Sequence, residues 1–374
     1  MSRHLVYLIG EDWFFASHFL ARARAAREAG WRVSVLTHVG EAAAALRADG
    51  FTVIGVDFVR ARLNPVGEGR LLASIVRHYR EVRPDLVHHV ALKPILLGSV
   101  AARLAGVRAV VNAPVGQGFV FSSNSAKARL LRPFVRAGLR ATLGARGAFA
   151  VFENGEDRAE MIGSGAVAEA RAVLIPGAGV DLTQFRPHQP AAGPVRVVLG
   201  ARMLRAKGVM EFIAAARMLK ERGVDAEFIL AGAPDPGNPA SLTEAELRAA
   251  QGVNWIGRCD DMAGLFASAH IACLPSYREG LPKFLLEAMA ACLPCVATDV
   301  VGCRDAVADG ETGLLVAPRN AGALAVALDR LIGDPALRSR LGAEGRARAE
   351  EKFSDPVICA RTLEVYDRAI GREG

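Results

Sequence analysis

Short apolar runs alternate along the chain with longer segments in which apolar residues recur every three or four positions. In the first half this pattern predicts strands at about residues 4–9, 32–37, 51–56, 86–89, 109–112 and 148–152, and helices at about 16–29, 41–49, 67–82, 94–105 and 125–143. Regular alternation of strands and helices is typical of a parallel sheet with helices on both faces. Such sheets bind ligands at the carboxyl ends of their strands.

The alternation is interrupted between about residues 175 and 190, where glycines and prolines replace the periodic pattern. A second series follows, with strands expected at about 196–199, 227–231, 253–255, 271–274, 295–298 and 313–316 and helical segments from 321 to 370. For a chain of 374 residues, this pattern predicts two Rossmann-like, doubly wound α/β domains, at 1–185 and 186–352, facing each other across a cleft. We expect the C-terminal helix, within 353–374, to be able to cross back to the first domain.

The stretch from Pro275 to Val316 contains the strongest candidate site. Glu279 and Glu287 lie eight residues apart around Gly280-Leu281-Pro282, which is typical of a tight loop leading directly into a helix. Proline suits the first position of a helix, so we expect this helix at about 282–291.

The beginning of that helix is suited to an anion, because its N–H groups are unpaired and the positive end of its dipole lies there. Lys283 and Glu287 are four residues apart and should share one face of the helix. A nucleotide sugar fits such a site, since its diphosphate accepts hydrogen bonds from N–H groups and its hydroxyls donate to carboxylates. These residues alone leave open the alternative of an ordinary surface helix with acidic residues near its start.

A second candidate segment, GARMLRAKG at 200–208, follows the first strand of the second half. Arg202 and Lys207 lie five residues apart across this loop, so both can reach one phosphate group. An arginine fork and a lysine point charge together suit a diphosphate leaving group. Two cations in a surface loop with no ligand are the alternative.

Basic residues are concentrated in the first half of the chain. Residues 1–185 hold 23 Lys and Arg against 15 Asp and Glu, whereas the remainder holds 23 against 24. No basic run with interleaved aromatic residues is present, so we expect no nucleic-acid partner. An anionic membrane surface or a phosphate-bearing acceptor suits this charge, and a solvated basic surface remains possible.

The expected helix at 125–143 is the most basic amphipathic segment. It combines apolar residues with five cations: Lys127, Arg129, Arg132, Arg136 and Arg140. Such a helix can lie on an anionic leaflet, although its apolar residues are explained equally well by packing on the sheet.

No apolar run is long enough to span a membrane, and the first residues lack the features of a signal peptide, so we expect a cytoplasmic protein. Cys292 and Cys295 form a C-x-x-C pair, which suggests either redox or zinc chemistry or two small buried side chains. No second cysteine pair has zinc-ligand spacing, which favours the buried interpretation.

In the first half, the loops after the expected strands supply weaker candidates. Asp12 and His18 follow the first strand, Lys93 follows the fourth, and Gly116 follows the fifth. Lys93 could contact a phosphate if the ligand reaches it. His18 is equally well explained as a packing residue.

Taken together, these segments resemble the family 4 glycosyltransferases, which have the GT-B fold of two Rossmann-like domains. The resemblance rests on Glu279 to Glu287 with the GLP insert, on GARMLRAKG, on IPGAGVDLTQF and on IGRCDD at 256–261. The segments DWFFASHF, HHVALKP and VVNAPVGQGFVF resemble bacterial enzymes that build surface polysaccharides on polyprenyl-diphosphate carriers. Two positions differ from many members: Gly10-Glu11-Asp12 replaces a Gly-Gly loop, and Val115-Gly116 replaces a histidine.

The resemblance implies a retaining transferase that moves a sugar from a UDP-sugar to a lipid-linked glycan acceptor at the inner membrane surface, without a cofactor or metal ion. It assigns the donor sugar to Glu279, the ribose to Glu287 and the diphosphate to Arg202 and Lys207. It also assigns donor binding to the helix-start residues Gly280, Leu281, Pro282 and Lys283, and the nucleobase to Arg258 and Cys259. The absence of an Asp-x-Asp sequence agrees with metal independence. A nucleotide-sugar epimerase of the same fold and a catalytically silent sugar-nucleotide-binding subunit are the alternatives.

Overall fold

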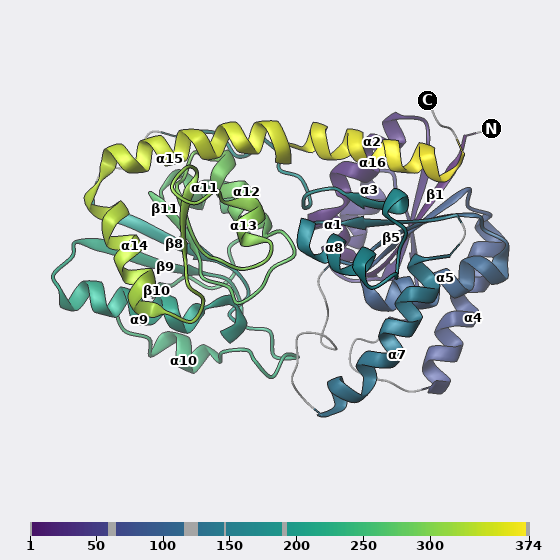
Figure 1. Ribbon diagram of the computed structural model, residues 1–374, viewed down its shortest axis with the longest axis horizontal. Helices are drawn as coiled ribbons and strands as arrows, with labels where there is room; N and C mark the ends of the chain where they lie inside the picture. The colour runs from purple at the N-terminus through teal and green to yellow at the C-terminus, as the bar shows by residue number, and fades with distance from the viewer. Residues whose placement is uncertain (1, 59–64, 116–125, 146, 189–192, 372–374) are drawn as a thin grey trace. The chain divides into compact units, whose positions relative to one another are not determined.

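The computed structural model describes residues 2–58, 65–115, 126–145, 147–188 and 193–371 (Figure 1). The chain divides into two compact units, one made of Met1–Pro176 with Ile358–Gly374 and the other of Gly177–Val357. The division falls at residues 176 and 177 rather than at the expected 185 and 186. The reason is that Val180 and Phe185 are buried in the core of the second unit.

A parallel seven-stranded sheet forms the centre of the first unit, in the order β3-β2-β1-β4-β5-β6-β7. Its strands are β1 (His4–Glu11), β2 (Arg32–His38), β3 (Thr52–Gly55), β4 (Leu86–Val90), β5 (Ala109–Ala113), β6 (Ala148–Phe152) and β7 (Ala172–Leu174). Alternate residues of β1 enter different cores: Leu5 and Tyr7 on one face, Val6 and Leu8 on the other. Burial on both faces is what makes these strands continuous apolar runs in the sequence.

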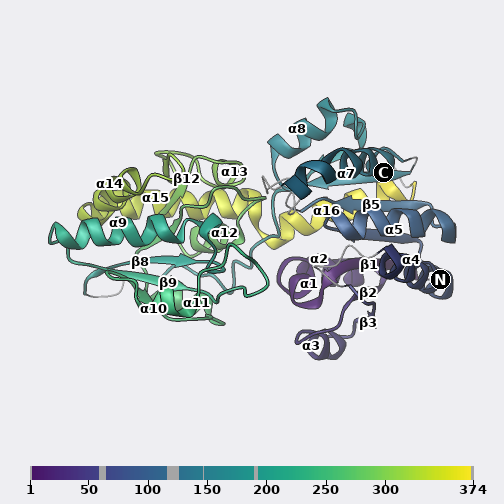
Figure 2. The same cartoon turned by 90° about the horizontal axis from the view of Figure 1, so that it is seen from below.

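Helices cover both faces of this sheet (Figure 2). The helices whose residues pack with Leu5 and Tyr7 are α1 (Asp12–His18), α2 (Leu20–Glu28), α3 (Ala43–Ala48) and α16 (Asp355–Ala369). The helices α4 (Pro65–Val82) and α5 (Leu92–Ala105) pack with Val6 and Leu8. Beside α5 lies α7 (Ala126–Leu143), where a Cβ on Gly138 would come within 2.8 Å of Leu96.

Two local features of the first unit differ from the expected elements. The helix expected at 16–29 is two helices, interrupted at Phe19, whose backbone leaves the helical region while its N–H still donates to Phe15 O at 2.8 Å. The helix α8 (Gly155–Gly163) and strand β7 were not expected. Asn154 begins α8 by accepting a hydrogen bond from the N–H of Asp157.

Buried hydrogen bonds between two tyrosine hydroxyls and a histidine ring connect the last helix to this sheet. The hydroxyls of Tyr7 and Tyr366 are 2.7 Å apart, and Tyr366 Oη lies 2.7 Å from His88 Nδ1. Burial lowers the pKa of His88 well below its usual value, so the imidazole is neutral in the folded protein. These contacts join α16 to β1 and β4 within the first unit.

The second unit is built on a parallel six-stranded sheet in the order β10-β9-β8-β11-β12-β13. Its strands are β8 (Val195–Gly200), β9 (Ala226–Ala231), β10 (Asn254–Trp255), β11 (Ile271–Leu274), β12 (Cys295–Thr298) and β13 (Gly313–Val316). Its helices are α9 (Val209–Glu221), α10 (Glu244–Arg248), α11 (Met262–Ala267), α12 (Lys283–Ala290), α13 (Cys303–Ala306), α14 (Ala321–Gly333) and α15 (Pro335–Arg348). All six strands lie within two residues of their expected ends.

Within the described part of the chain, no helix is long and apolar enough to cross a membrane.

Candidate active site

The two candidate segments in the second half of the sequence follow neighbouring strands, so both lie at the same edge of the sheet. Residues 201–208 follow β8, and residues 275–282 follow β11, which pairs with β8. The strand order reverses between these two strands, since the chain runs from β8 to β9 and β10 on one side and from β11 to β12 and β13 on the other. Ligands of open α/β sheets bind at such a reversal point.

Backbone contacts fix these two loops against each other. The N–H of Tyr277 donates to Ala206 O at 2.9 Å. Gly208 has φ +72° and lies so close to Pro275 that an added Cβ would collide with its carbonyl oxygen. Glycine is required here both for the left-handed backbone and for the close approach. The loops therefore present their side chains from a defined framework.

The most specific feature of this edge is an ion pair between Lys207 and Glu279. Lys207 Nζ lies 2.6 Å from Glu279 Oε1 and 2.7 Å from Oε2, so both carboxylate oxygens accept a hydrogen bond. Only 10% of the Glu279 side chain and 23% of the Lys207 side chain is exposed. Lys207 and Glu279, which the sequence analysis identified in two separate segments, are therefore in direct contact.

A second ion pair lies on the helix that follows. Lys283 Nζ is 3.1 Å from Glu287 Oε1, as expected from the spacing of four residues. Burial raises the pKa of the Glu287 carboxyl, and the charge of Lys283 opposes that effect. The helix starts one residue later than expected: Pro282 is its N-cap, with an extended ψ of 111°, and α12 begins at Lys283.

Two other predicted cations have acidic partners of their own. Arg202 Nη1 lies 2.6 Å from Asp235 Oδ2, and half of the arginine side chain is exposed. The exposed Arg258 pairs with Asp260 at 2.8 Å, while the neighbouring Cys259 thiol donates to Asp261 O at 3.3 Å. Asp235 lies in the loop after β9, and nothing in the sequence pattern indicated it.

A further group beside the Glu279 loop was also missed from the sequence. The hydroxyl of Tyr277 donates to Glu211 Oε1 at 2.7 Å, and the Arg319 guanidinium lies 4.5 Å from the centre of the Tyr277 ring. Burial, together with Glu211, raises the pKa of Tyr277 to about 12. Tyr277 lies in the segment already singled out, but its partners come from α9 and the loop after β13.

The backbone at the beginning of α12 is held by the next loop of the sheet. The N–H of Glu279 donates to Val301 O at 3.2 Å, and Gly302, with φ +80°, approaches the carbonyl oxygens of Glu279 and Gly280. Leu281 is buried in the core with Leu286. Gly280, Leu281 and Pro282 therefore form a fixed approach to the helix rather than a loose surface turn.

The C-x-x-C pair consists of free thiols. Cys295 is fully buried, which raises its pKa to about 12, and Cys292 is partly buried with φ +61°. Among the described residues, no three His, Cys, Asp or Glu side chains are grouped so as to hold a metal ion. The buried interpretation is therefore right for Cys295, whereas Cys292 keeps some exposure.

The weaker candidates of the first unit lie at separate places. Asp12 is buried at the start of α1, where one carboxylate oxygen accepts from Gly40 N at 2.6 Å and the other has no hydrogen-bond partner among the described residues. His18 packs on Phe14 at the end of the same helix, with ring centres 4.2 Å apart. Lys93 lies inside the first turn of α5 and pairs with Glu68 at 2.7 Å. Gly116 lies outside the described residues.

Two parallel α/β units, one of which has paired acidic and basic loops at its strand reversal, are the architecture of the GT-B fold. Family models agree: residues 181–348 match the glycosyl transferases group 1, and residues 4–143 match the glycosyl transferase 4-like family. The chain therefore belongs to the group 1, family 4 glycosyltransferases.

Relatives and solved structures are consistent with this assignment. The N,N'-diacetylbacillosaminyl-diphospho-undecaprenol alpha-1,3-N-acetylgalactosaminyltransferase of Campylobacter jejuni is 29% identical over 339 residues, which is 87% of this chain and 88% of the relative. Sucrose-phosphate synthase from Thermosynechococcus elongatus has a similar fold, with a TM-score of 0.80, 21% identity and coverage of 98% of this chain and 99% of that one. HepE from Anabaena, in complex with UDP and glucose, gives a TM-score of 0.77 at 18% identity, covering 98% of this chain and 100% of that one.

Proposed function

We propose that this glycosyltransferase moves a sugar from a UDP-sugar to a glycan carried on a polyprenyl diphosphate, with retention of anomeric configuration and without a metal ion. Its product belongs to the synthesis of a bacterial surface polysaccharide. The observation that carries the proposal is the ion pair between Lys207 and Glu279 at the strand reversal of the second unit.

In this proposal the donor diphosphate binds Lys207 and Arg202. Both side chains follow β8, and each is held by a carboxylate, Glu279 or Asp235, that a phosphate group can replace as partner. The backbone N–H groups at the start of α12 add the positive end of a helix dipole. These groups supply the positive charge that a diphosphate leaving group requires.

The two glutamates bind the hydroxyl-bearing parts of the donor. Glu279, released from Lys207 when the diphosphate binds, accepts hydrogen bonds from the donor sugar. Glu287, held by Lys283 one turn into the helix, accepts from the ribose hydroxyls. The backbone around Arg258 and Cys259 meets the nucleobase. The proposed nucleotide is UDP, which is also present with glucose in the structure of HepE, a protein of the same fold.

In the chemical step, the acceptor hydroxyl oxygen bonds to the anomeric carbon on the face from which the diphosphate departs. The bond between the anomeric carbon and the diphosphate oxygen breaks, and that oxygen takes the proton of the acceptor hydroxyl. Lys207 and Arg202 stabilise the charge that grows on the departing diphosphate. One well-placed donor of this kind contributes about 3–4 kcal/mol to catalysis.

The acceptor assignment rests on the first half of the chain and on the Campylobacter jejuni relative, whose name specifies a diphospho-undecaprenol substrate. A lipid-linked acceptor places the enzyme at the inner face of the plasma membrane as a peripheral protein. The excess of basic residues in 1–185 suits that surface.

The test is release of free nucleotide from a panel of UDP-, GDP- and ADP-sugars in the presence of EDTA, with and without a polyprenyl-diphosphate glycan extract. We expect release from one UDP-sugar that depends on the extract and survives EDTA. Release that needs no lipid, or that stops when divalent ions are chelated, would contradict the acceptor or the metal-free mechanism respectively.

A further inference from the structure

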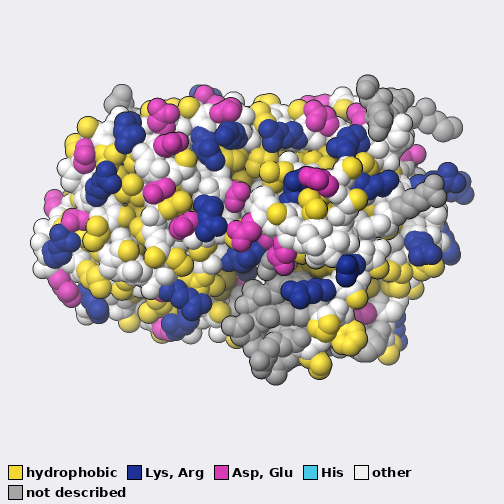
Figure 3. Space-filling view, viewed as in Figure 1, with side chains coloured by type: hydrophobic (Ala, Val, Ile, Leu, Met, Phe, Trp, Pro, Cys, Tyr) yellow, Lys and Arg dark blue, Asp and Glu magenta, His cyan; other side chains and the backbone are white. Residues whose placement is uncertain are grey.

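Acidic and basic side chains are interspersed on the visible face of the second unit, at the left of Figure 3. Around the candidate site, cations and carboxylates form pairs: Arg202 with Asp235, Arg205 with Glu246 and Lys207 with Glu279. The carboxylate of Glu211, in the first turn of α9, is held differently. Its Oε1 accepts from the neutral hydroxyl of Tyr277 at 2.7 Å, and its Oε2 is buried without a hydrogen-bond partner in the part of the chain that the structure describes. Neither residue takes part in the chemical step proposed for this site.

Tyr277 contacts the segment that carries Lys207 on both sides of the lysine. The backbone N–H of Tyr277 donates at 2.9 Å to the carbonyl oxygen of Ala206, the residue before the lysine. The tyrosine hydroxyl reaches Glu211, four residues after the lysine. Glu279, two residues beyond Tyr277, holds the ammonium group itself. Tyr277 therefore connects the loop that carries the lysine to the loop that carries the glutamate.

The neighbouring loops also fix the position of Tyr277. Ser276, the residue before it, is fully buried, and its carbonyl oxygen accepts a hydrogen bond from the hydroxyl of Thr298 at the end of β12. The Arg319 guanidinium lies 4.5 Å from the centre of the tyrosine ring. Burial, together with Glu211, raises the pKa of Tyr277 to about 12, so the hydroxyl stays protonated at neutral pH and donates its hydrogen.

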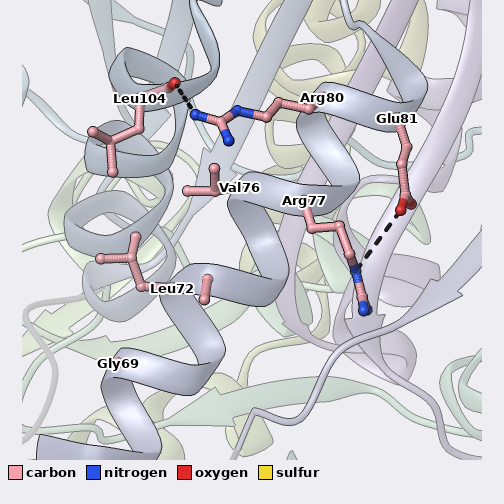
Figure 4. Close-up of a pocket in the computed structure, with 8 residues that line it drawn as sticks. Gly69, Leu72, Val76, Arg77, Arg80, Glu81 and Leu104 are labelled. Atoms are coloured by element: carbon pink, nitrogen blue, oxygen red, sulfur yellow. Dashed lines mark hydrogen bonds and ion pairs between the residues drawn. The ribbon is translucent and has the colours of Figure 1, made fainter.

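A groove of about 550 Å³ between α4 and α5, in the first unit, shows charged side chains with a different kind of contact (Figure 4). Arg80 donates to Leu104 O at 3.1 Å and so joins the two helices, and Arg77 pairs with Glu81 at 3.8 Å within α4. None of the described residues that line this groove is a candidate site residue. The hydrogen bonds of Tyr277, by contrast, connect two segments of the candidate site.

We infer that Tyr277 is a positioning residue of the transfer reaction, which holds the Lys207 ammonium where the terminal phosphate of a nucleoside diphosphate binds. It does so through its hydrogen bonds on either side of the lysine. A lysine side chain is a flexible stem, so a fixed backbone on both sides reduces the freedom that binding must remove. This inference rests on the proposed function, which assigns the diphosphate to Lys207. Tyr277 itself contacts neither donor nor acceptor.

The experiment is isothermal titration calorimetry of the full-length protein with UDP and with UMP, which lacks the terminal phosphate. Tyr277→Phe removes the hydroxyl and keeps both the ring and the backbone N–H. We expect it to bind UDP about tenfold more weakly than wild type, as for loss of a hydrogen bond to a charged group, and to keep its affinity for UMP. Glu211→Ala should show the same selective loss. Glu211→Gln, whose amide oxygen still accepts from the hydroxyl, should lose no more than about threefold.

Glu221→Ala, at an exposed glutamate near the other end of α9, is the matched control and should bind UDP like wild type. Thermal unfolding of each variant shows whether it is folded. In a Lys207→Ala background, Tyr277→Phe should cause no further loss of UDP affinity, because the tyrosine acts through the lysine.

Three results would each overturn the inference: an unchanged UDP affinity of Tyr277→Phe, an equal loss of affinity for UMP, or a further loss in the Lys207→Ala background. A wild-type protein that binds UDP no better than UMP would instead contradict the assignment of the diphosphate to Lys207, and with it the proposed function. The titration uses no acceptor, so it decides the role of Tyr277 whether or not a lipid-linked glycan proves to be the acceptor.

Discussion

Lys207 and Glu279, 72 residues apart in the sequence, form an ion pair in which one ammonium group contacts both oxygens of one carboxylate. In the proposed reaction this pair is the resting state of the donor site. The carboxylate holds the lysine in place until a diphosphate takes its position, and is then free to accept from a sugar hydroxyl. When the diphosphate replaces Glu279 as the partner of Lys207, the lysine binds the diphosphate and the glutamate becomes available to the sugar.

Replacement of Lys207 by alanine should lower kcat by roughly two to three orders of magnitude, because one cation that stabilises the leaving diphosphate is lost. Steady-state kinetics with the identified donor measures the effect. The matched control is Lys220→Ala, at an exposed lysine near the end of α9, which should retain the wild-type rate. A folded Lys207→Ala enzyme with an unchanged kcat would remove Lys207 from the mechanism.

Replacement of Glu287 by alanine should act mainly on donor binding. The carboxylate accepts from the ribose, which is equally bound before and during the reaction, so KM for the donor should rise about tenfold while kcat changes little. Glu344→Ala, at an exposed position on α15, is the control. If the donor KM of Glu287→Ala equals that of the wild type, Glu287 does not contact the ribose.

The raised pKa of Glu287 also predicts a pH dependence of stability. Because the carboxyl binds a proton more readily in the folded state than in the unfolded state, its contribution to stability falls as pH rises through the raised pKa. Glu287→Gln should therefore unfold at a higher temperature than the wild type at about pH 7.5, and this difference should shrink toward about pH 5. Calorimetric scans of both proteins measure it, and a difference that grows on acidification would contradict a raised pKa.

Because Gly208 lies so close to Pro275, its replacement by alanine should destabilise the protein more than the same replacement at Gly223. Both Gly208 and Gly223 have positive φ, but a Cβ at Gly223 would meet no atom within 4 Å. Gly223→Ala should cost about 1 kcal/mol of unfolding free energy from backbone strain alone. Gly208→Ala should cost at least about 2 kcal/mol, since overpacking adds to the strain. Equal losses in denaturant titrations would mean that the two loops are not fixed against each other.

Much of the fold follows directly from the sequence. The strands were predicted closely because parallel strands covered on both faces are continuous apolar runs, as at β4 and β11. The Lys283–Glu287 contact was also predictable, since residues four apart on a helix are neighbours. The start of α12 was wrong by one residue because proline suits both the N-cap and the first helical position.

Other features depend on tertiary packing that no local pattern encodes. Strand–helix alternation predicts that Lys207 and Glu279 lie at one edge of a sheet. Their direct contact depends on the packing of the two loops against each other, which is closest where Gly208 approaches Pro275. The partners of Arg202 and Tyr277, which are Asp235 and Glu211, come from other loops and helices and could not be identified by spacing. The roles assigned to the site residues stay predictions until substrates are tested.

The most direct test of the proposed reaction is the anomeric configuration of its product, determined by proton NMR after transfer in the presence of EDTA. We predict that an α-linked UDP-sugar gives an α-linked sugar on the polyprenyl-diphosphate glycan, because the acceptor attacks the face from which the diphosphate departs. A β-linked product, or no product once metal ions are chelated, would contradict the mechanism in which Lys207 and Arg202 stabilise the leaving diphosphate.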